Sequence, residues 1–150
     1  MRIGLTLILL FASHTCSNEI VRQESSDLVG QWKVEITFDN QAQILLRFDA
    51  KDSGKGTFLL EGERSNWAEP AKPSTAKWTQ AASKRVTFSG PVEFPIGNVG
   101  REPGTLTFKG TFEKDDLISG KAAFYPMGQD PADPKLTPSK TGKFKATRVG

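Results

Sequence analysis

The clearest pattern in the chain is a strict alternation of apolar and polar residues over residues 104–112. Leucine, phenylalanine and Gly110 fall on one side of a two-residue period, and threonine and lysine fall on the other. Such alternation predicts a half-buried antiparallel strand. The acidic stretch at residues 113–116 contains no apolar residue and predicts a turn, after which residues 117–124 return as a second strand.

Two registers are possible for this hairpin. With a four-residue connection, Phe112 lies opposite Leu117, and several apolar side chains fall on the polar face. With a connection one residue longer, or with a bulge, Phe112 lies opposite Ile118 and the larger apolar groups share one face. We therefore expect the second register, which places Gly110 opposite Gly120. Paired glycines inside a strand often mark a sharp bend in a barrel wall, although glycine is sometimes simply tolerated there.

The same two-residue period recurs along the chain, and turn signals separate the segments at short spacing without any helical period. This combination is typical of an antiparallel barrel or sandwich. We predict an all-β fold, a small antiparallel up-and-down β-barrel of about eight strands, with a β-sandwich as the alternative. Proline-rich residues 64–75, 91–103 and 125–139 are predicted to be loops. The predicted strands are residues 28–38, 43–49, 57–63, 77–81, 84–90, 104–112, 117–124 and 142–149.

The first residues have the character of an export signal. Residues 3–12 form a nearly continuous apolar run after Arg2, too short to span a bilayer but suited to the core of a secretory signal. Cys16, the single cysteine of the chain, follows this run. A lone thiol in an oxidising compartment has no disulfide partner, so it needs another role.

The position of Cys16 resembles the lipobox of bacterial lipoproteins, and the resemblance implies that this cysteine is acylated and becomes the new N-terminus. We expect an exported lipoprotein of the outer membrane or periplasm that touches the membrane only through its N-terminal lipid. The alternative is ordinary secretion with cleavage near Ser17. With 150 residues, one domain is the natural expectation. The expected divisions are a signal and lipobox segment at 1–16, a flexible linker at 17–27 and a barrel domain at 28–150.

The motif Gly30-Gln-Trp32 resembles the Gly-x-Trp signature that opens the first strand of lipocalins and related calycin barrels. The resemblance covers roughly residues 28–149 and suggests a lipocalin-like domain of a bacterial lipoprotein. It implies that Trp32 plugs the closed end of the barrel and that Arg148 packs over it in a cation–π contact. The alternative for Trp32 is an ordinary core tryptophan.

The composition excludes several kinds of catalytic site. The only histidine, His14, lies in the predicted signal, so the remaining domain lacks Ser-His-Asp and Cys-His machinery and any zinc site built from histidine or cysteine. The remaining candidates for acid–base work are the pairs Asp115-Asp116 and Asp130/Asp133, together with Tyr125, and both pairs are more typical of solvated turns. We expect a non-catalytic protein without cofactor or metal. The net charge of +3 is too dispersed for a nucleic-acid interface.

A small barrel offers its end as a ligand site, and the candidate residues lie in or beside the predicted loops, where apolar side chains are less expected. The main prediction is that the protein binds a small apolar ligand. The first alternative is a structural or protein-interaction module with a partner in the cell envelope, and the second is a carboxylate- or tyrosine-type enzyme. The candidate ligand-binding residues are Trp67, Trp78, Phe94, Ile96, Arg101 and Tyr125.

Overall fold

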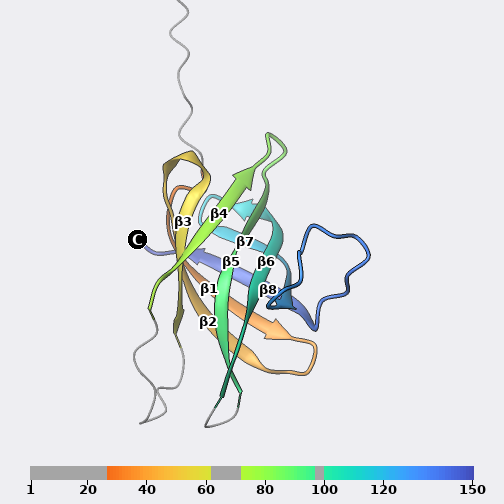
Figure 1. Cartoon of the computed structure of the whole chain (residues 1–150). Helices are drawn as coiled ribbons and strands as arrows, with labels where there is room; N and C mark the ends of the chain where they lie inside the picture. Colours follow the sequence, from red (N-terminus) through yellow and green to blue (C-terminus); the bar gives the residue numbers. More distant parts are fainter. Residues whose placement is uncertain (1–26, 62–71, 97–99) are drawn as a thin grey trace, which may run out of the picture.

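The computed structural model of the chain describes residues 27–61, 72–96 and 100–150, with Pro95 and Ile96 described by their backbone alone. Eight antiparallel strands pair in chain order, and β1 also pairs with β8, so that the sheet closes into a barrel (Figure 1). The predicted up-and-down barrel is confirmed, and closure of the sheet excludes the sandwich. The strands are β1 (Gly30–Phe38), β2 (Gln43–Ala50), β3 (Lys55–Glu61), β4 (Ser74–Gln80), β5 (Arg85–Ile96), β6 (Gly100–Lys114), β7 (Leu117–Pro126) and β8 (Lys140–Arg148).

Helix is nearly absent from the described part of the chain. A single turn of 3-10 helix, Asp52–Gly54, connects β2 to β3. No helix among the described residues is long and apolar enough to cross a lipid bilayer.

The β6–β7 hairpin has the register expected from its apolar pattern. Phe112 lies opposite Ile118 and Gly110 lies opposite Gly120, with an irregularity between Phe112 and Lys114. The extra residue keeps the larger apolar side chains on the inner face, because a shift of one position would turn them outward.

Residues 91–103 differ from the prediction. They were expected to form a loop, but β5 and β6 continue through Pro91 and Pro103 and pair as far as Ile96 and Gly100. Proline lacks a backbone N–H and is tolerated in strands whose other edge is open. Among the described residues, β5 beyond Ser89 pairs only with β6, so proline interrupts no second ladder there.

Strand directions define two ends of the barrel. At the Trp32 end, β1 begins and β8 ends, and the β2–β3, β4–β5 and β6–β7 connections turn. At the opposite end, called the mouth end below, β1 ends and β8 begins. Figure 1 shows the long β5–β6 hairpin extending past the neighbouring strands at the mouth end, and the loop between β7 and β8 projecting to the side.

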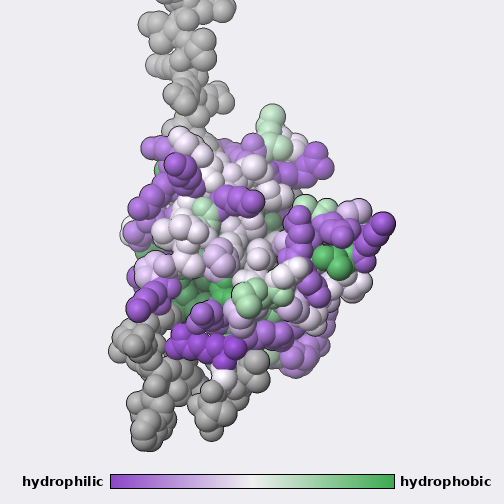
Figure 2. Space-filling model, in the orientation of Figure 1, coloured by the Kyte–Doolittle hydropathy of each residue, from purple (hydrophilic) through white to green (hydrophobic). Residues whose placement is uncertain are grey.

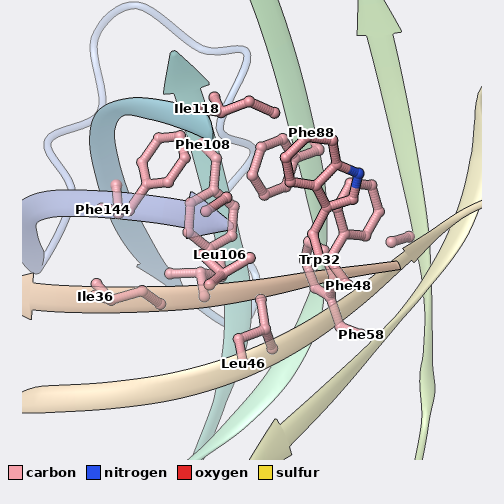
Figure 3. Close-up of a cluster of buried hydrophobic side chains, with 14 of the residues drawn as sticks. Trp32, Ile36, Leu46, Phe48, Phe58, Phe88, Leu106, Phe108, Ile118 and Phe144 are labelled. Atoms are coloured by element: carbon pink, nitrogen blue, oxygen red, sulfur yellow. The ribbon is translucent and has the colours of Figure 1, made fainter. Parts of the chain in front are cut away.

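The interior of the barrel is occupied by packed aromatic rings (Figure 3). The Phe88 ring lies between Phe48, at a centroid distance of 4.6 Å, and Phe108, at 4.4 Å, and both pairs are stacked. Phe58 and Phe144 meet the Phe88 ring edge-on. Offset stacks and edge-to-face contacts are the favoured geometries of aromatic pairs. The centre of the barrel is therefore a packed core and not a hollow ligand chamber.

Glycines on the inner face make room for these rings. A Cβ atom at Gly110 would lie 2.7 Å from a ring carbon of Phe144 and 2.6 Å from the carbonyl oxygen of Ser119. At Gly120, a Cβ atom would lie 2.1 Å from the carbonyl oxygen of Lys109. Real Cβ atoms do not approach other atoms this closely, so the close pairing of β6 and β7 requires glycine at both positions.

Candidate functional site: a groove at the mouth end

The Trp32 end of the barrel is closed by side chains. Trp32 is fully buried, and its indole N–H donates a hydrogen bond to the carbonyl of Leu28 at 2.8 Å. The Arg148 guanidinium lies over the ring, 4.4 Å from its centroid. The same guanidinium donates hydrogen bonds to the carbonyl oxygens of Val29, at 2.8 Å, and Asp27. The structure thus places Arg148 against Trp32, the contact expected from the resemblance noted in the sequence.

The centre of the mouth end is also covered. Phe94 and Phe124 meet edge to face at 4.6 Å, and Phe38 packs against Phe94 at 5.7 Å. The Lys140 ammonium lies 5.0 Å from the Phe124 ring centroid and forms a 2.7 Å ion pair with Glu102. A small molecule cannot enter the barrel axis here without displacing this layer.

The accessible site is instead a groove in the side of the mouth end, with a volume of about 630 Å³. It lies where the wall of the barrel is incomplete. On one side, β4 begins at Ser74, opposite Phe58 of β3. On the other side, β4 pairs with β5 only between residues 86 and 89, so the mouth-end part of β5 has no described partner on β4. The Ser74 hydroxyl donates a 2.6 Å hydrogen bond to the carbonyl of Pro91 across this gap. The remaining space between β3 and the β5–β6 hairpin forms the groove.

The groove has an apolar floor and a charged rim. Its buried or half-buried apolar side chains are Phe58 and Leu60 from β3 and Val92 from β5. Figure 2 shows a recessed hydrophobic area in the lower part of the view, bordered by hydrophilic side chains. The rim carries exposed charged and neutral residues: Lys72, Pro73, Pro91, Glu93, Arg101, Pro103, Met127 and Gly128.

Charge at the rim is partly compensated. The Arg101 guanidinium and the Glu93 carboxylate lie 3.4 Å apart, and both side chains are substantially exposed. Exposed ion pairs of this kind hold their partners only weakly, so each charge can exchange its partner for a ligand at small cost. An apolar floor with a few polar groups around it is the usual composition of a small-molecule site.

The predicted ligand residues are distributed over the molecule. Arg101 lines the groove, whereas Phe94 belongs to the buried core at the mouth end. Trp78 lies on β4 toward the Trp32 end and donates hydrogen bonds from its indole N–H to the carbonyls of Lys51 and Lys55. Tyr125 is half-buried on the outer side of β7, opposite Thr105. Trp67 and the side chain of Ile96 lie outside the described part of the structure.

Sequence reasoning missed the floor of the groove. Phe58, Leu60 and Val92 follow the ordinary alternation of core strands, and nothing in that period distinguishes a groove residue from a core residue. The available signal was the placement of Pro73, Pro91 and Pro103, because proline collects where a strand has an unpaired edge.

The candidate carboxylates form turns. Asp130 and Asp133 each accept a backbone N–H two residues further on, at 2.9 Å in both cases. These are Asx turns, which stabilise loops and require no catalytic role. Asp115 and Asp116 are exposed in the β6–β7 turn. Among the described residues, no three or more His, Cys, Asp or Glu side chains are grouped so as to hold a metal ion.

Comparisons with known proteins identify no family. No protein-family model matches the chain, and no curated protein matches its sequence. One solved structure, that of a redesigned β-barrel, is similar over 83% of this chain and 93% of that chain, at 11% sequence identity and a TM-score of 0.44.

Proposed function

We propose that the protein binds a small apolar ligand without catalysis, and that the ligand lies in the mouth-end groove. The observation that carries the proposal is the combination of a ring-filled interior with a groove of about 630 Å³ floored by apolar side chains. A site of this volume accommodates a ligand of ordinary small-molecule size. The Arg101 and Lys72 side chains at the rim favour a ligand with a polar or anionic end.

The groove is tested by replacing Leu60, a half-buried residue of its floor, with glutamate. The parent protein should bind an anilinonaphthalene sulfonate dye and a medium-chain fatty acid. The Leu60→Glu variant should bind both at least about tenfold more weakly, since it loses apolar contact and places a carboxylate in the site. Dye fluorescence titration and calorimetry measure the two affinities.

Val149→Glu is the matched control, because Val149 is an exposed apolar residue at the Trp32 end, far along the sheet from the groove. Its affinity should equal that of the parent. Equal binding by Leu60→Glu and the parent, with both variants folded by circular dichroism, would rule out the groove as the site.

The filled interior also favours a second candidate, a structural or protein-interaction module of the cell envelope. A barrel whose rings occupy its centre is a rigid scaffold, and rigid scaffolds suit binding through their outer surface and loops. If the folded parent protein binds neither the dye nor the fatty acid, the interaction module is favoured over the ligand-binding protein.

We propose further that the protein is exported and anchored to a membrane through an acylated Cys16, with secretion after cleavage near Ser17 as the alternative. The support is the apolar run at residues 3–12 followed by the single cysteine. Intact mass spectrometry of the protein extracted from membranes should give a chain that begins at Cys16 and carries fatty acyl groups. A Cys16→Ser variant should instead accumulate without acyl groups. An unmodified mature chain starting near Ser17 in the culture medium would contradict the anchor.

A further inference from the structure

The outer wall of the barrel carries a row of three lysines on adjacent strands. Lys121 of β7 lies directly opposite Lys109 of β6 on one side and Lys143 of β8 on the other. All three are exposed, and within the described residues none forms an ion pair with an acid. Like charges placed directly opposite each other across strands lower stability. The row therefore costs the free protein stability that a covering anion would restore.

The rows on either side add two cations and a frame of hydroxyl groups. The row toward the Trp32 end has Arg85 and Lys145 at its ends and Thr111 and Ser119 between them. The row toward the mouth end consists of Ser89, Thr107, Ala123 and Thr141. The twelve outward positions of the three rows are called the basic face: residues 85, 87 and 89 of β5, 107, 109 and 111 of β6, 119, 121 and 123 of β7, and 141, 143 and 145 of β8.

The basic face has a one-sided composition. Its positions hold five cations, six hydroxyl-bearing residues and one alanine, without an acidic or aromatic residue. Three acids border it: Glu35 lies opposite Lys145, and Glu113 and Asp39 accept hydrogen bonds from the Ser119 and Thr141 hydroxyls.

Several cations elsewhere on the wall are paired with acids. On β1, Lys33 pairs with Glu35 at 3.1 Å, and between β2 and β3 Arg47 pairs with Glu61. These pairs neutralise part of the charge of β1–β3, although Lys55 of β3 and Lys77 of β4 lie opposite each other as a smaller like-charged pair. The basic face, with its five cations, leaves a concentrated positive field toward solvent.

We propose that the basic face binds a linear anionic polysaccharide. Neighbouring strands lie about 4.8 Å apart, so four strands spread the cations over roughly 14 Å, which suits a chain with repeated charges better than one small anion. Several of the hydroxyl groups between the cations are already hydrogen-bonded within the protein, but a hydroxyl oxygen has two lone pairs and can still accept a hydrogen bond from a sugar hydroxyl.

Other anionic partners fit the basic face less well. Single-stranded nucleic acids are held by base stacking on aromatic side chains, and the face has none. Membrane surfaces are held more firmly when large apolar side chains insert, but the exposed large apolar residues of the described chain, Met127 and Val149, lie outside the face.

The test is binding of a fluorescent heparin oligosaccharide at low and moderate salt, followed by anisotropy. The triple variant Lys109→Gln/Lys121→Gln/Lys143→Gln should bind about tenfold or more weakly and show a shallower dependence on salt, because three screened charge contacts are lost. The matched control, Arg47→Gln/Lys51→Gln/Lys55→Gln, changes the net charge equally on the wall of β2 and β3 and should bind within about twofold of the parent.

A second variant separates polysaccharide from other polyanions. Replacing Thr107 and Thr111 with valine keeps all cations and the shape of the strands, and should weaken heparin binding while leaving inorganic polyphosphate binding unchanged. Two results would overturn the proposal at once: no heparin binding by the parent, or equal losses of affinity in the basic-face and control triple variants. It would also fail if the parent bound polyphosphate more tightly than heparin and the valine variant bound polyphosphate as tightly as the parent does.

Discussion

Replacing Phe88 with alanine should destabilise the barrel by about 3–5 kcal/mol, the usual cost of deleting a buried phenylalanine ring. Phe88 is 2% exposed and stands between the stacked rings of Phe48 and Phe108. Phe58 and Phe144 press on its edges, so the surrounding rings cannot move together to fill the space without breaking their own contacts. Because domains of this size are stable by only about 5–15 kcal/mol, the loss should remove much of the total. Urea unfolding followed by circular dichroism measures it.

Phe88→Leu serves as the companion variant, since leucine keeps most of the apolar volume and loses only the aromatic geometry. We expect it to cost less than half as much as alanine. A loss below about 1 kcal/mol for Phe88→Ala would contradict a tightly packed interior and would reopen the barrel centre as a possible ligand cavity.

Replacing Arg148 with alanine should cost about 2–4 kcal/mol, although Arg148 lies at the end of the barrel. Its guanidinium covers the buried indole of Trp32 and satisfies the carbonyl oxygens of Val29 and Asp27. Alanine removes the cation–π contact and exposes the indole, and it also leaves the carbonyls of Val29, Asp27 and Asp115 without their charged donor. The midpoint of urea unfolding should fall, and the summed emission of the three tryptophans, including Trp32, should shift toward that of a hydrated indole.

Two variants calibrate this result. Arg148→Lys keeps the positive charge over the ring but not the planar fork that reaches two carbonyls, so it should recover only part of the loss. Arg47→Ala removes an exposed ion pair with Glu61 and should cost less than about 1 kcal/mol. A loss at Arg148 no larger than that at Arg47 would show that the Trp32 end is held by its apolar contacts alone.

The sequence predicted the barrel well where the period of two was unbroken. In the β6–β7 hairpin, the requirement that Phe112 and Ile118 share one face fixed the register, because any one-residue shift would expose the core. The contact between Trp32 and Arg148 was expected only from the resemblance to calycin barrels. The two residues lie on the first and last strands and are adjacent because the sheet closes.

Prediction failed where distant parts of the chain decide local structure. Pro91 and Pro103 have the composition of a loop, yet they form strands because β5 has an open edge at that level. Phe94 lies in a stretch whose composition predicts a loop, but contacts with Phe38 and Phe124 from other strands bury it. The groove exists because β4 and the β5–β6 hairpin differ in length, and no local pattern records that difference.

The same strand holds a cation over an aromatic ring at each end of the barrel. Lys140, where β8 begins, lies over Phe124, and Arg148, where β8 ends, lies over Trp32. β8 also completes the ring of strands by pairing with β1 and β7. During synthesis, before β8 leaves the ribosome, the edges of β1 and β7 are therefore unpaired, and the rings of Phe124 and Trp32 lack their covering cations. Closure and capping of the barrel come together, as the last step in forming the domain, which joins its two most distant strands.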